Sequence, residues 1–344
     1  MKTETMKKTV VGMVVALMLG NPAAAGTLEE VMERGEVKCG ALGTIPGFSA
    51  VNDDGKYTGL DSDTCRAVAA LVFGDASKTQ FISLNFKAGL TALVAGEVDM
   101  LPFATTHTLT RDGSLGMDFT YYNFIDGQGF LARKSLGVSG AKQLDGARIC
   151  TLAGTTSEGN VADYFRTNGM SFTPKSYAST TQVREAYERD ACDVVTSDKS
   201  QLAAIRSELS DPSNAVILPE TISKEPLGPV VRQGDDVWAN IVRWTIYGML
   251  NAEELGISSQ NVEAMKSSEN PAIRRLLGLE SGLCELLSEK LPNDCFVQVI
   301  RQVGNYAEMY EANVGENTPI GIPRAGSPNA LWTEGGILYS PPMR

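Results

Sequence analysis

Arg111 and Asp198 carry opposite charges, and each lies close to a run of hydroxyl-bearing side chains. Arg111 follows Thr106 by five residues, beyond a predicted strand, where a guanidinium could bind a carboxylate through two hydrogen bonds. Asp198 ends a second predicted strand and could pair with an ammonium group. Because a buried charge is very costly unless it is paired, a buried α-amino acid would need both partners. The sequence leaves open that Arg111 instead pairs with Asp112 or Asp118, and that Asp198 is a solvated turn residue.

A second group of hydroxyls lies between a predicted strand and a predicted helix, in residues 154–158 (GTTSE). Exposed N–H groups and the helix dipole attract an anion at such a place, so Thr155 and Thr156 are candidate ligand contacts. The same residues also match a capping box, in which Thr155 and Glu158 satisfy these N–H groups without any ligand. Both can hold together if Thr156 and Ser157 face a cleft.

His107 is the only histidine of the chain and lies inside the cluster of threonines. Neither a Ser or Cys nucleophile with signature flanks nor a set of metal ligands accompanies it, so we expect it to shape the wall of a pocket. Phe48, Phe103 and Tyr122 could line the same pocket, although such aromatic residues are more often part of a core. We expect no catalytic residue, no metal and no cofactor.

These residues are positioned by a pattern that occurs twice, in residues 90–108 and 183–198. Each copy reads as an amphipathic helix, a tight turn, a buried strand led by an acidic residue, and a cluster of hydroxyls. The predicted apolar stripes are Leu90, Leu93 and Val94 in the first copy, which Gly96 ends, and Val183, Ala186 and Tyr187 in the second. Ligands of open parallel α/β sheets bind outside the carboxyl ends of the strands, so two such edges facing each other would form a clamp.

The rest of the chain predicts the elements around this clamp. We expect strands at residues 37–42, 127–132, 148–152 and 215–219, a loop at 43–55, a helix from about Asp63, a second helix reaching about Phe165, and irregular structure at 119–126. Residues 222–232 contain two prolines and a glycine, which suits a segment that crosses between domains. Later helices include a long apolar face built from Trp238, Ile241, Val242, Ile246 and Leu250.

Two crossings, near Asp126 and near Gly228, imply two lobes connected by a hinge. The first lobe would contain residues 26–126 and 228–344, and the second would contain residues 127–227. The remaining residues, 1–25, carry lysines, an apolar run and three alanines, and so predict a secretory signal peptide cleaved after Ala25. The apolar run is shorter than the roughly 20 residues that a bilayer core requires.

Composition narrows the class of protein further. Removal of residues 1–25 leaves 319 residues, enough for two domains, and moves the formal net charge from −11 to −13 because three Lys and one Glu are lost. Such a charge argues against nucleic acid, whose binding depends on Lys and Arg at phosphates, and against anionic membranes.

Six cysteines in an exported chain predict disulfides, although sequence alone allows 15 pairings. Position narrows the choice, because two cysteines belong to the first strand and helix of one half, two belong to strands of the other half, and two remain as a local pair. The predicted pairs are Cys39 with Cys65, Cys150 with Cys192, and Cys284 with Cys295. A metal site is the alternative, but it lacks CxxC spacing and has one histidine to draw on.

From about Thr27 to Arg344 the chain resembles the periplasmic substrate-binding proteins of the general L-amino-acid ABC transporters, within the polar amino-acid binding family. The most specific stretches are residues 72–75 (VFGD), 126–130 (DGQGF) and 222–236 (ISKEPLGPVVRQGDD). The resemblance implies the type II periplasmic binding protein fold, an α/β fold of two lobes, each a mixed sheet flanked by helices, joined by two crossing segments. The first two cysteine pairs stand where the family has cysteines, whereas the third is not associated with it.

The resemblance also implies roles for single residues. The carboxylate-binding arginine of the family falls on Arg111 with Thr106 as its companion, the second-lobe site on Thr155 and Thr156, and the acid for the amino group on Asp198. The chain departs from the family where residues 103–108 read FATTHT, because the family there typically reads RNTTWT. A cation, an amide and an indole near the pocket are thereby replaced, so a narrower or different ligand is plausible.

The leading hypothesis is the periplasmic solute-binding component of an ABC importer, a monomer that captures an amino acid or a related zwitterion by hinge closure. It would deliver this ligand to a membrane permease with its ATPase, and no bond would be made or broken. The alternatives are a secreted dehydratase or lyase on the same fold, with His107 or a cleft carboxylate as general acid, and a sensor protein that presents its ligand to a separate receptor.

Overall fold

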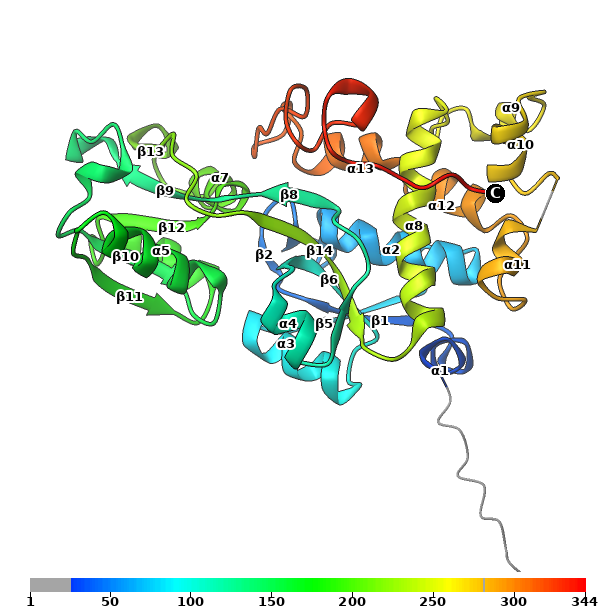
Figure 1. Ribbon diagram of the computed structural model, residues 1–344, viewed down its shortest axis with the longest axis horizontal. Coiled ribbons are helices and arrows are strands. Elements are labelled where there is room, and N and C mark those ends of the chain that lie inside the picture. Colours follow the sequence, from blue (N-terminus) through cyan, green and yellow to red (C-terminus); the bar gives the residue numbers. More distant parts are fainter. Residues whose placement is uncertain (1–25, 281) are drawn as a thin grey trace, which may run out of the picture.

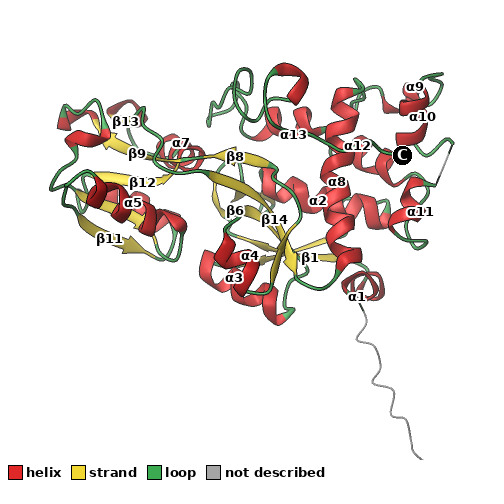
Figure 2. Cartoon of the chain, viewed as in Figure 1, coloured by secondary structure: helices red, strands yellow, loops and turns green. Residues whose placement is uncertain are grey.

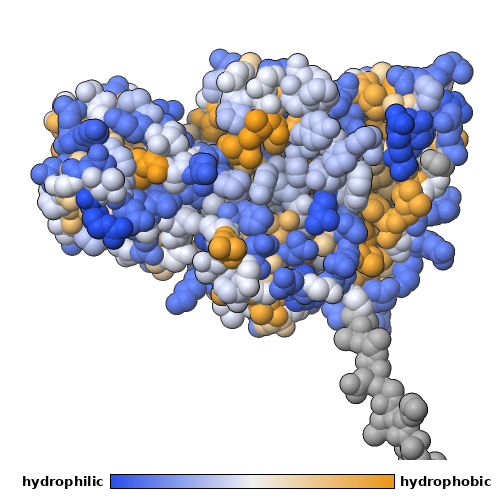
Figure 3. Space-filling model, in the orientation of Figure 1, coloured by the Kyte–Doolittle hydropathy of each residue, from blue (hydrophilic) through white to orange (hydrophobic). Residues whose placement is uncertain are grey.

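The computed structural model describes residues 26–280 and 282–344, and the predicted signal peptide lies outside this part of the chain. The described residues form two lobes that follow one another along the longest axis of the molecule (Figure 1). Within this part, no helix is both long and apolar enough to cross a membrane. The face drawn in Figure 3 is mostly hydrophilic over the lobe that contains β9 to β13.

The second lobe, lobe 2, is built on a mixed sheet of five strands in the order β11-β10-β12-β9-β13. Strand β10 runs parallel to β11 and β12, whereas β9 runs antiparallel to β12 and β13. Side chains alternate between the faces of this sheet, so that Phe130 packs with α5 on one face and Leu131 packs with α6 and α7 on the other. The elements are β9 (Gln128–Arg133), η1 (Lys134–Leu136), η2 (Ala141–Gln143), β10 (Arg148–Leu152), α5 (Thr156–Thr167), β11 (Thr173–Tyr177), α6 (Thr180–Glu188), β12 (Val194–Asp198), α7 (Lys199–Ser207), η3 (Pro212–Asn214) and β13 (Ala215–Ile217).

The first lobe, lobe 1, combines the beginning and the end of the chain around a second sheet. Strand β1 pairs in parallel with β5, an isolated bridge from Cys39 to Met100 leads on to β6, and β14 pairs with β6, β7 and β8. Its first elements are α1 (Thr27–Arg34), β1 (Val37–Ala41), β2 (Thr44–Ile45), β3 (Ser49–Val51), β4 (Tyr57–Thr58), α2 (Leu60–Phe73), β5 (Thr79–Ser83), α3 (Phe86–Ala95), β6 (Leu101–Thr106), α4 (Leu109–Ser114), β7 (Met117–Phe119) and β8 (Phe124–Asp126).

The C-terminal part of the chain adds helices to lobe 1, beside α2 (Figure 2). The long helix α8 contributes the buried residues Trp238, Ile241, Val242 and Ile246, so the apolar face predicted for it is confirmed. These elements are β14 (Glu225–Arg232), α8 (Asp236–Glu254), α9 (Val262–Met265), α10 (Pro271–Leu276), α11 (Leu283–Leu287), α12 (Cys295–Gln302), α13 (Tyr306–Asn313) and η4 (Trp332–Glu334).

The chain passes from lobe 1 to lobe 2 between β8 and β9 and returns between β13 and β14. Residues 222–232 are predicted to be a crossing segment, but from Glu225 onward they form a strand inside the sheet of lobe 1. Pro229 is accommodated because the register of β14 shifts between Gly228 and Val230. Gly228 is required at this point, because a Cβ there would lie 1.8 Å from the carbonyl oxygen of Tyr121.

Other predictions of the sequence analysis are corrected by the structure. The predicted loop at residues 43–55 contains β2 and β3, and the predicted irregular segment at 119–126 contains β8, because strands this short leave little periodic signal. In α3 the buried face is Phe86, Gly89, Ala92 and Leu93, whereas Val94 is 50% exposed. The second predicted stripe is confirmed, since Val183, Ala186 and Tyr187 are buried.

All three predicted disulfides are present. Cys39 is bonded to Cys65, Cys150 to Cys192, and Cys284 to Cys295, and the described residues contain no free cysteine. The first bridge joins β1 to α2 in lobe 1, and the second joins β10 to the residue pair that precedes β12 in lobe 2. Each lobe is therefore cross-linked within itself, and no disulfide in the described residues restrains the movement of one lobe relative to the other.

Candidate functional site

Residues from both lobes line one small cavity between them. Lobe 1 contributes Leu42, Phe86, Ala104, Thr106 and Arg111, and lobe 2 contributes Leu152, Thr155, Thr156, Ser157, Ser197, Asp198 and Gln201. Five residues that the sequence predicts for the site, Thr106, Arg111, Thr155, Thr156 and Asp198, are thus brought together. They come from the end of β6, from α4, from the start of α5 and from the end of β12.

Arg111 is held in the wall of the cavity by lobe 1. The backbone N–H of Arg111 donates to the side chain of Thr108, the N-cap of α4. The Nη1 of Arg111 donates to the Thr106 carbonyl oxygen at 2.7 Å. The guanidinium lies 4.9 Å from the centre of the Phe86 ring, and the residue is only 7% exposed. Burial lowers the pKa of Arg111, and the nearby carboxylates of Glu225 and Asp198 oppose this shift.

The surface ion pair considered for Arg111 is not formed. Among the described residues the Arg111 guanidinium takes part in no ion pair, while Asp112 faces His107 at 3.5 Å and Asp118 faces Arg243 at 3.9 Å. A buried guanidinium with donors left over is suited to bind an anion that enters the cavity.

Asp198 faces the same cavity from lobe 2, at the last position of β12. It is 4% exposed, so the alternative of a solvated turn residue is wrong. Burial raises the pKa of Asp198 well above its ordinary value, the like charges of Asp126 and Glu225 add to the shift, and Arg111 opposes it. A carboxyl group in these surroundings gains from a cation, because an ammonium group would offset the repulsion of its neighbours.

The start of α5 does not form the capping box considered from the sequence. The Thr155 hydroxyl donates to the Leu152 carbonyl oxygen at 2.8 Å instead of accepting from the first turn. The Glu158 carboxylate accepts from the Gly154 N–H at 2.8 Å and from the Ser176 hydroxyl at 2.5 Å, not from the N-cap. The N-cap side chain therefore leaves the first-turn N–H groups of α5 open to an anion.

Phe48 and His107, which the sequence analysis included among the ligand contacts, are not among the residues that line the cavity. Phe48 is 1% exposed and packs edge-on against Phe124 in the core of lobe 1, with 5.3 Å between ring centres. His107 stacks on Phe119 at 4.3 Å, and its Nδ1 lies 3.1 Å from the Tyr122 hydroxyl. Packing partners that are distant in the sequence decide these orientations, so neither residue is carried into the proposed site.

The sequence analysis missed several residues of the site and its surroundings. Leu42 follows β1, Phe86 begins α3 and Leu152 ends β10, so their positions at strand and helix ends were the available signal. Glu225 is 1% exposed and accepts a hydrogen bond from the hydroxyl of Thr156 across the two lobes. No local pattern in the sequence points to that contact.

Two α/β lobes joined by two crossings, with a charged cavity between them, define a type II periplasmic binding protein. The chain belongs to the bacterial extracellular solute-binding proteins, family 3, which it matches over residues 37–260. It is 49% identical over 332 residues to YhdW of Escherichia coli strain K12, covering 96% of both chains. It is 46% identical over 334 residues to the general L-amino acid-binding periplasmic protein AapJ of Rhizobium johnstonii, covering 97% of both chains.

The fold agrees with a solved structure of similar sequence. A periplasmic binding protein of an ABC transporter from Brucella ovis, with glutathione bound, superposes with a TM-score of 0.90 at 47% identity. The match covers 93% of this chain and 100% of that chain, so it includes the C-terminal helices beyond the region of the family match.

Proposed function

We propose that this chain is the periplasmic solute-binding component of an ABC importer for an amino acid or an amino-acid-like zwitterion. The observation that carries the proposal is the meeting of Arg111 from lobe 1 and Asp198 from lobe 2 on one cavity. Relatives named for binding general L-amino acids or glutamate, glutamine, aspartate and asparagine, and the related structure with glutathione, support the same chemical class. Each of these ligands carries an ammonium group and a carboxylate.

In this proposal the Arg111 guanidinium and the first-turn N–H groups of α5 bind the ligand carboxylate, and Asp198 binds the ammonium group. The lobes, predicted as residues 26–126 with 228–344 and residues 127–227, but with β14 in the sheet of lobe 1 from Glu225 onward, close around the ligand by bending at the crossings. Each charge-assisted hydrogen bond contributes about 1.5 to 3 kcal/mol. Because micromolar binding requires about −8 kcal/mol, a few such contacts in a closed cleft are sufficient.

Capture and delivery require no chemical step, and we assign no catalytic residue. We further propose that the protein acts as a monomer in the periplasm, after cleavage behind Ala25, and passes its ligand to a membrane permease coupled to an ATPase. N-terminal sequencing of the exported protein should begin at Gly26. Deletion of the chain should abolish uptake of the ligand by cells that retain the permease.

Isothermal titration against the standard L-amino acids and glutathione tests the proposal most directly. The protein should first be unfolded in guanidinium without reductant, dialysed and refolded, so that retained ligand is lost and the disulfides stay closed. We expect at least one compound to bind more tightly than about 10 μM. The absence of binding to every amino acid and to glutathione by correctly refolded protein would refute it.

A further inference from the structure

Glu225 occupies the point where lobe 1 meets the start of α5. It is the first residue of β14, lies opposite Asp126 in the neighbouring strand β8, and is 1% exposed. Its Oε2 accepts from the Thr156 hydroxyl at 3.0 Å, and its Oε1 accepts from Asn160 Nδ2 at 2.8 Å and from the Ser223 hydroxyl at 2.5 Å. A strand of lobe 1 is thereby tied to the first turns of a helix of lobe 2.

The bond to Glu225 fixes the polarity of Thr156. A hydroxyl has a single proton, and an ionised carboxylate can only accept hydrogen bonds. The Thr156 hydroxyl donates its one hydrogen bond to Glu225 and also lines the cavity, so toward a ligand its oxygen can only accept. The Thr156 side chain is thus an acceptor toward the cavity, even though its backbone N–H remains a donor.

Two neighbouring hydroxyls also donate their one hydrogen bond within the protein. Thr155 donates to the Leu152 carbonyl oxygen at 2.8 Å, and Ser197 donates to Gln201 Oε1 at 3.0 Å. Both residues line the cavity on the side of lobe 2, which also holds Asp198. These three hydroxyls and the Asp198 carboxylate therefore present oxygen acceptors, whereas lobe 1 presents the Arg111 guanidinium.

We propose that Glu225 is a positioning residue that sets the specificity of the site. It accepts the hydrogen bond that the Thr156 hydroxyl can donate, so the Thr156 oxygen is left to accept a hydrogen bond from the ligand ammonium. The inference rests on the proposed function and deepens it. In this arrangement the Thr156 side chain and the Asp198 carboxylate accept from the ligand ammonium, whereas the Arg111 guanidinium and the backbone N–H groups of α5 donate to the ligand carboxylate. A ligand that places a carboxylate against the Thr156 side chain is rejected, since two acceptors would then face each other.

A double-mutant cycle of Glu225→Gln and Thr156→Val tests this inference by titration with the tightest ligand of the panel. In the glutamine variant we expect Asn160 and Ser223 to donate to the amide oxygen. The amide N–H₂ then faces Thr156 and donates to its oxygen, so the Thr156 O–H points into the cavity as a donor. We expect Glu225→Gln to weaken binding at least 10-fold when Thr156 is present, and less than 2-fold when it is added to the Thr156→Val variant. Equal losses in both backgrounds, or no loss in the first, would overturn the inference.

A second measurement does not depend on the folding of the Glu225 variant. Thr156→Val should weaken binding of the amino acid at least 10-fold, but should change binding of the matching deamino acid, which has hydrogen in place of the ammonium group and so no donor there, less than 3-fold. Thr156→Ser keeps the hydroxyl and should stay within about 3-fold of wild type for both compounds. Equal losses for amino acid and deamino acid would overturn the inference. Binding by the wild type in the same titrations tests the proposed function separately.

Discussion

The two lobes use an acidic residue in the same way just before the strand of the repeated pattern. In lobe 1, Asp99 precedes β6, and its carboxylate accepts from the Lys38 N–H at 2.7 Å while its own N–H donates to the Lys38 carbonyl at 2.8 Å. In lobe 2, Asp193 precedes β12 and makes the matching pair of bonds with Arg148, both at 2.8 Å. The acid fastens the turn before its strand to β1 in lobe 1 and to β10 in lobe 2.

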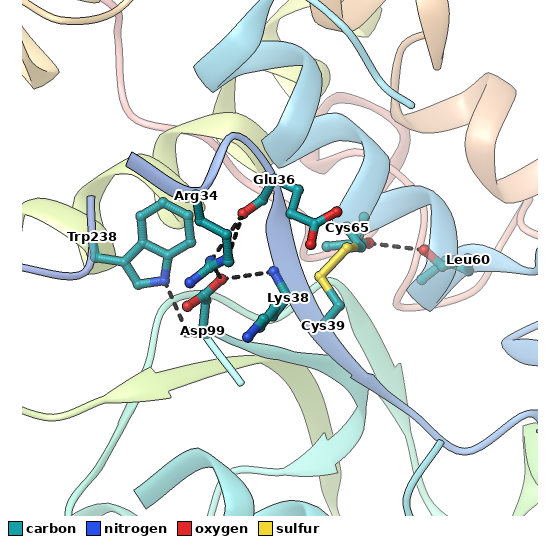
Figure 4. Close-up of a disulfide and its surroundings, with 9 residues drawn as sticks. Arg34, Glu36, Lys38, Cys39, Leu60, Cys65, Asp99 and Trp238 are labelled. Atoms are coloured by element: carbon teal, nitrogen blue, oxygen red, sulfur yellow. Dashed lines mark hydrogen bonds and ion pairs between the residues drawn. A yellow bond between two sulfur atoms is a disulfide. The ribbon is translucent and has the colours of Figure 1, made fainter. Parts of the chain in front are cut away.

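Each acid also has an arginine and a disulfide close by. Asp99 forms an ion pair with Arg34 beside the Cys39–Cys65 bridge (Figure 4), and Trp238 Nε1 donates to its carbonyl oxygen at 3.0 Å. Asp193 forms an ion pair with Arg148, and its neighbour Cys192 is bonded to Cys150.

The copies differ at the other end of the strand, where the ligand would be held. The strand of lobe 1 leads through Thr106 to the Arg111 guanidinium, and the strand of lobe 2 ends at the Asp198 carboxylate. The acid, its arginine and the nearby disulfide are thus repeated in both lobes, whereas the charged residue at the cavity is a cation in lobe 1 and an anion in lobe 2. This asymmetry suits a zwitterion, because the charged partner of its carboxylate, Arg111, and the charged partner of its ammonium group, Asp198, come from different lobes.

The largest effect should follow from removing either charge. Arg111→Ala and Asp198→Asn should each weaken ligand binding about 100- to 1000-fold, because the opposite end of a buried ligand is then left unpaired. Isothermal titration measures the change, and Asp112→Asn, which alters an acid beside Arg111 but outside the cavity, serves as the matched control. Unchanged binding in either variant would show that the two lobes do not share the zwitterion as proposed.

The residues of this comparison differ in how well the sequence predicts them. Arg111, Asp198 and Thr156 were predicted because each lies at or just beyond the end of a predicted strand, and such local signals place side chains at a sheet edge. Glu225 escaped, since its contact with Thr156 joins positions 69 residues apart and exists only once both lobes are folded. Phe48 was misplaced for the same reason, because its contact with Phe124 in the core turns the ring away from the cleft.

Removing the disulfide of each lobe allows the stabilities of the two lobes to be compared. The bridge of lobe 2 spans 42 residues and that of lobe 1 spans 26, so loop entropy predicts losses of about 4 and about 3.5 kcal/mol in unfolding free energy when each pair is replaced by serine. Hydrogen exchange should accelerate only in the lobe whose bridge is removed. The Cys284–Cys295 pair, which spans 11 residues outside the repeat, is the control with an expected loss of about 3 kcal/mol. Acceleration in both lobes would contradict the view that each lobe is stabilised separately.

Replacing Asp198 should have opposed effects on ligand binding and on the stability of the ligand-free protein. Burial and like charges raise the pKa of Asp198, so the folded protein holds this proton more tightly than the unfolded chain, in which the group titrates near 3.8. Its contribution to stability is therefore greatest below that pH and is lost as the pH rises through the folded pKa. Ligand-free Asp198→Asn escapes this loss and should melt about 2 °C or more above wild type near pH 7, with a smaller difference near pH 4. A lower melting temperature at neutral pH would show that the ionised carboxylate is not a cost to the empty cleft.

The smallest expected effect separates the two acids at the start of the pattern. The hydrogen bonds from Arg148 lower the pKa of Asp193, so its stabilisation is present above about pH 4 and is lost as the pH falls through the folded pKa. Burial raises the pKa of Asp99 despite its partners, so its contribution declines as the pH rises. Asp193→Asn should therefore cost less than about 1 kcal/mol at pH 7, as expected for a partly exposed pair, and this cost should shrink as the pH falls below about 4.

Asp99→Asn should have the opposite dependence and become less costly relative to wild type as the pH rises. Melting temperatures of both variants and of wild type, measured between about pH 3 and pH 7, give the two slopes directly. Slopes of the same sign would mean that the two acids lie in equivalent surroundings. Opposite slopes would show that the repeated pair of backbone bonds tolerates a buried acid in lobe 1 and a partly exposed one in lobe 2, because the bonds themselves are the shared requirement.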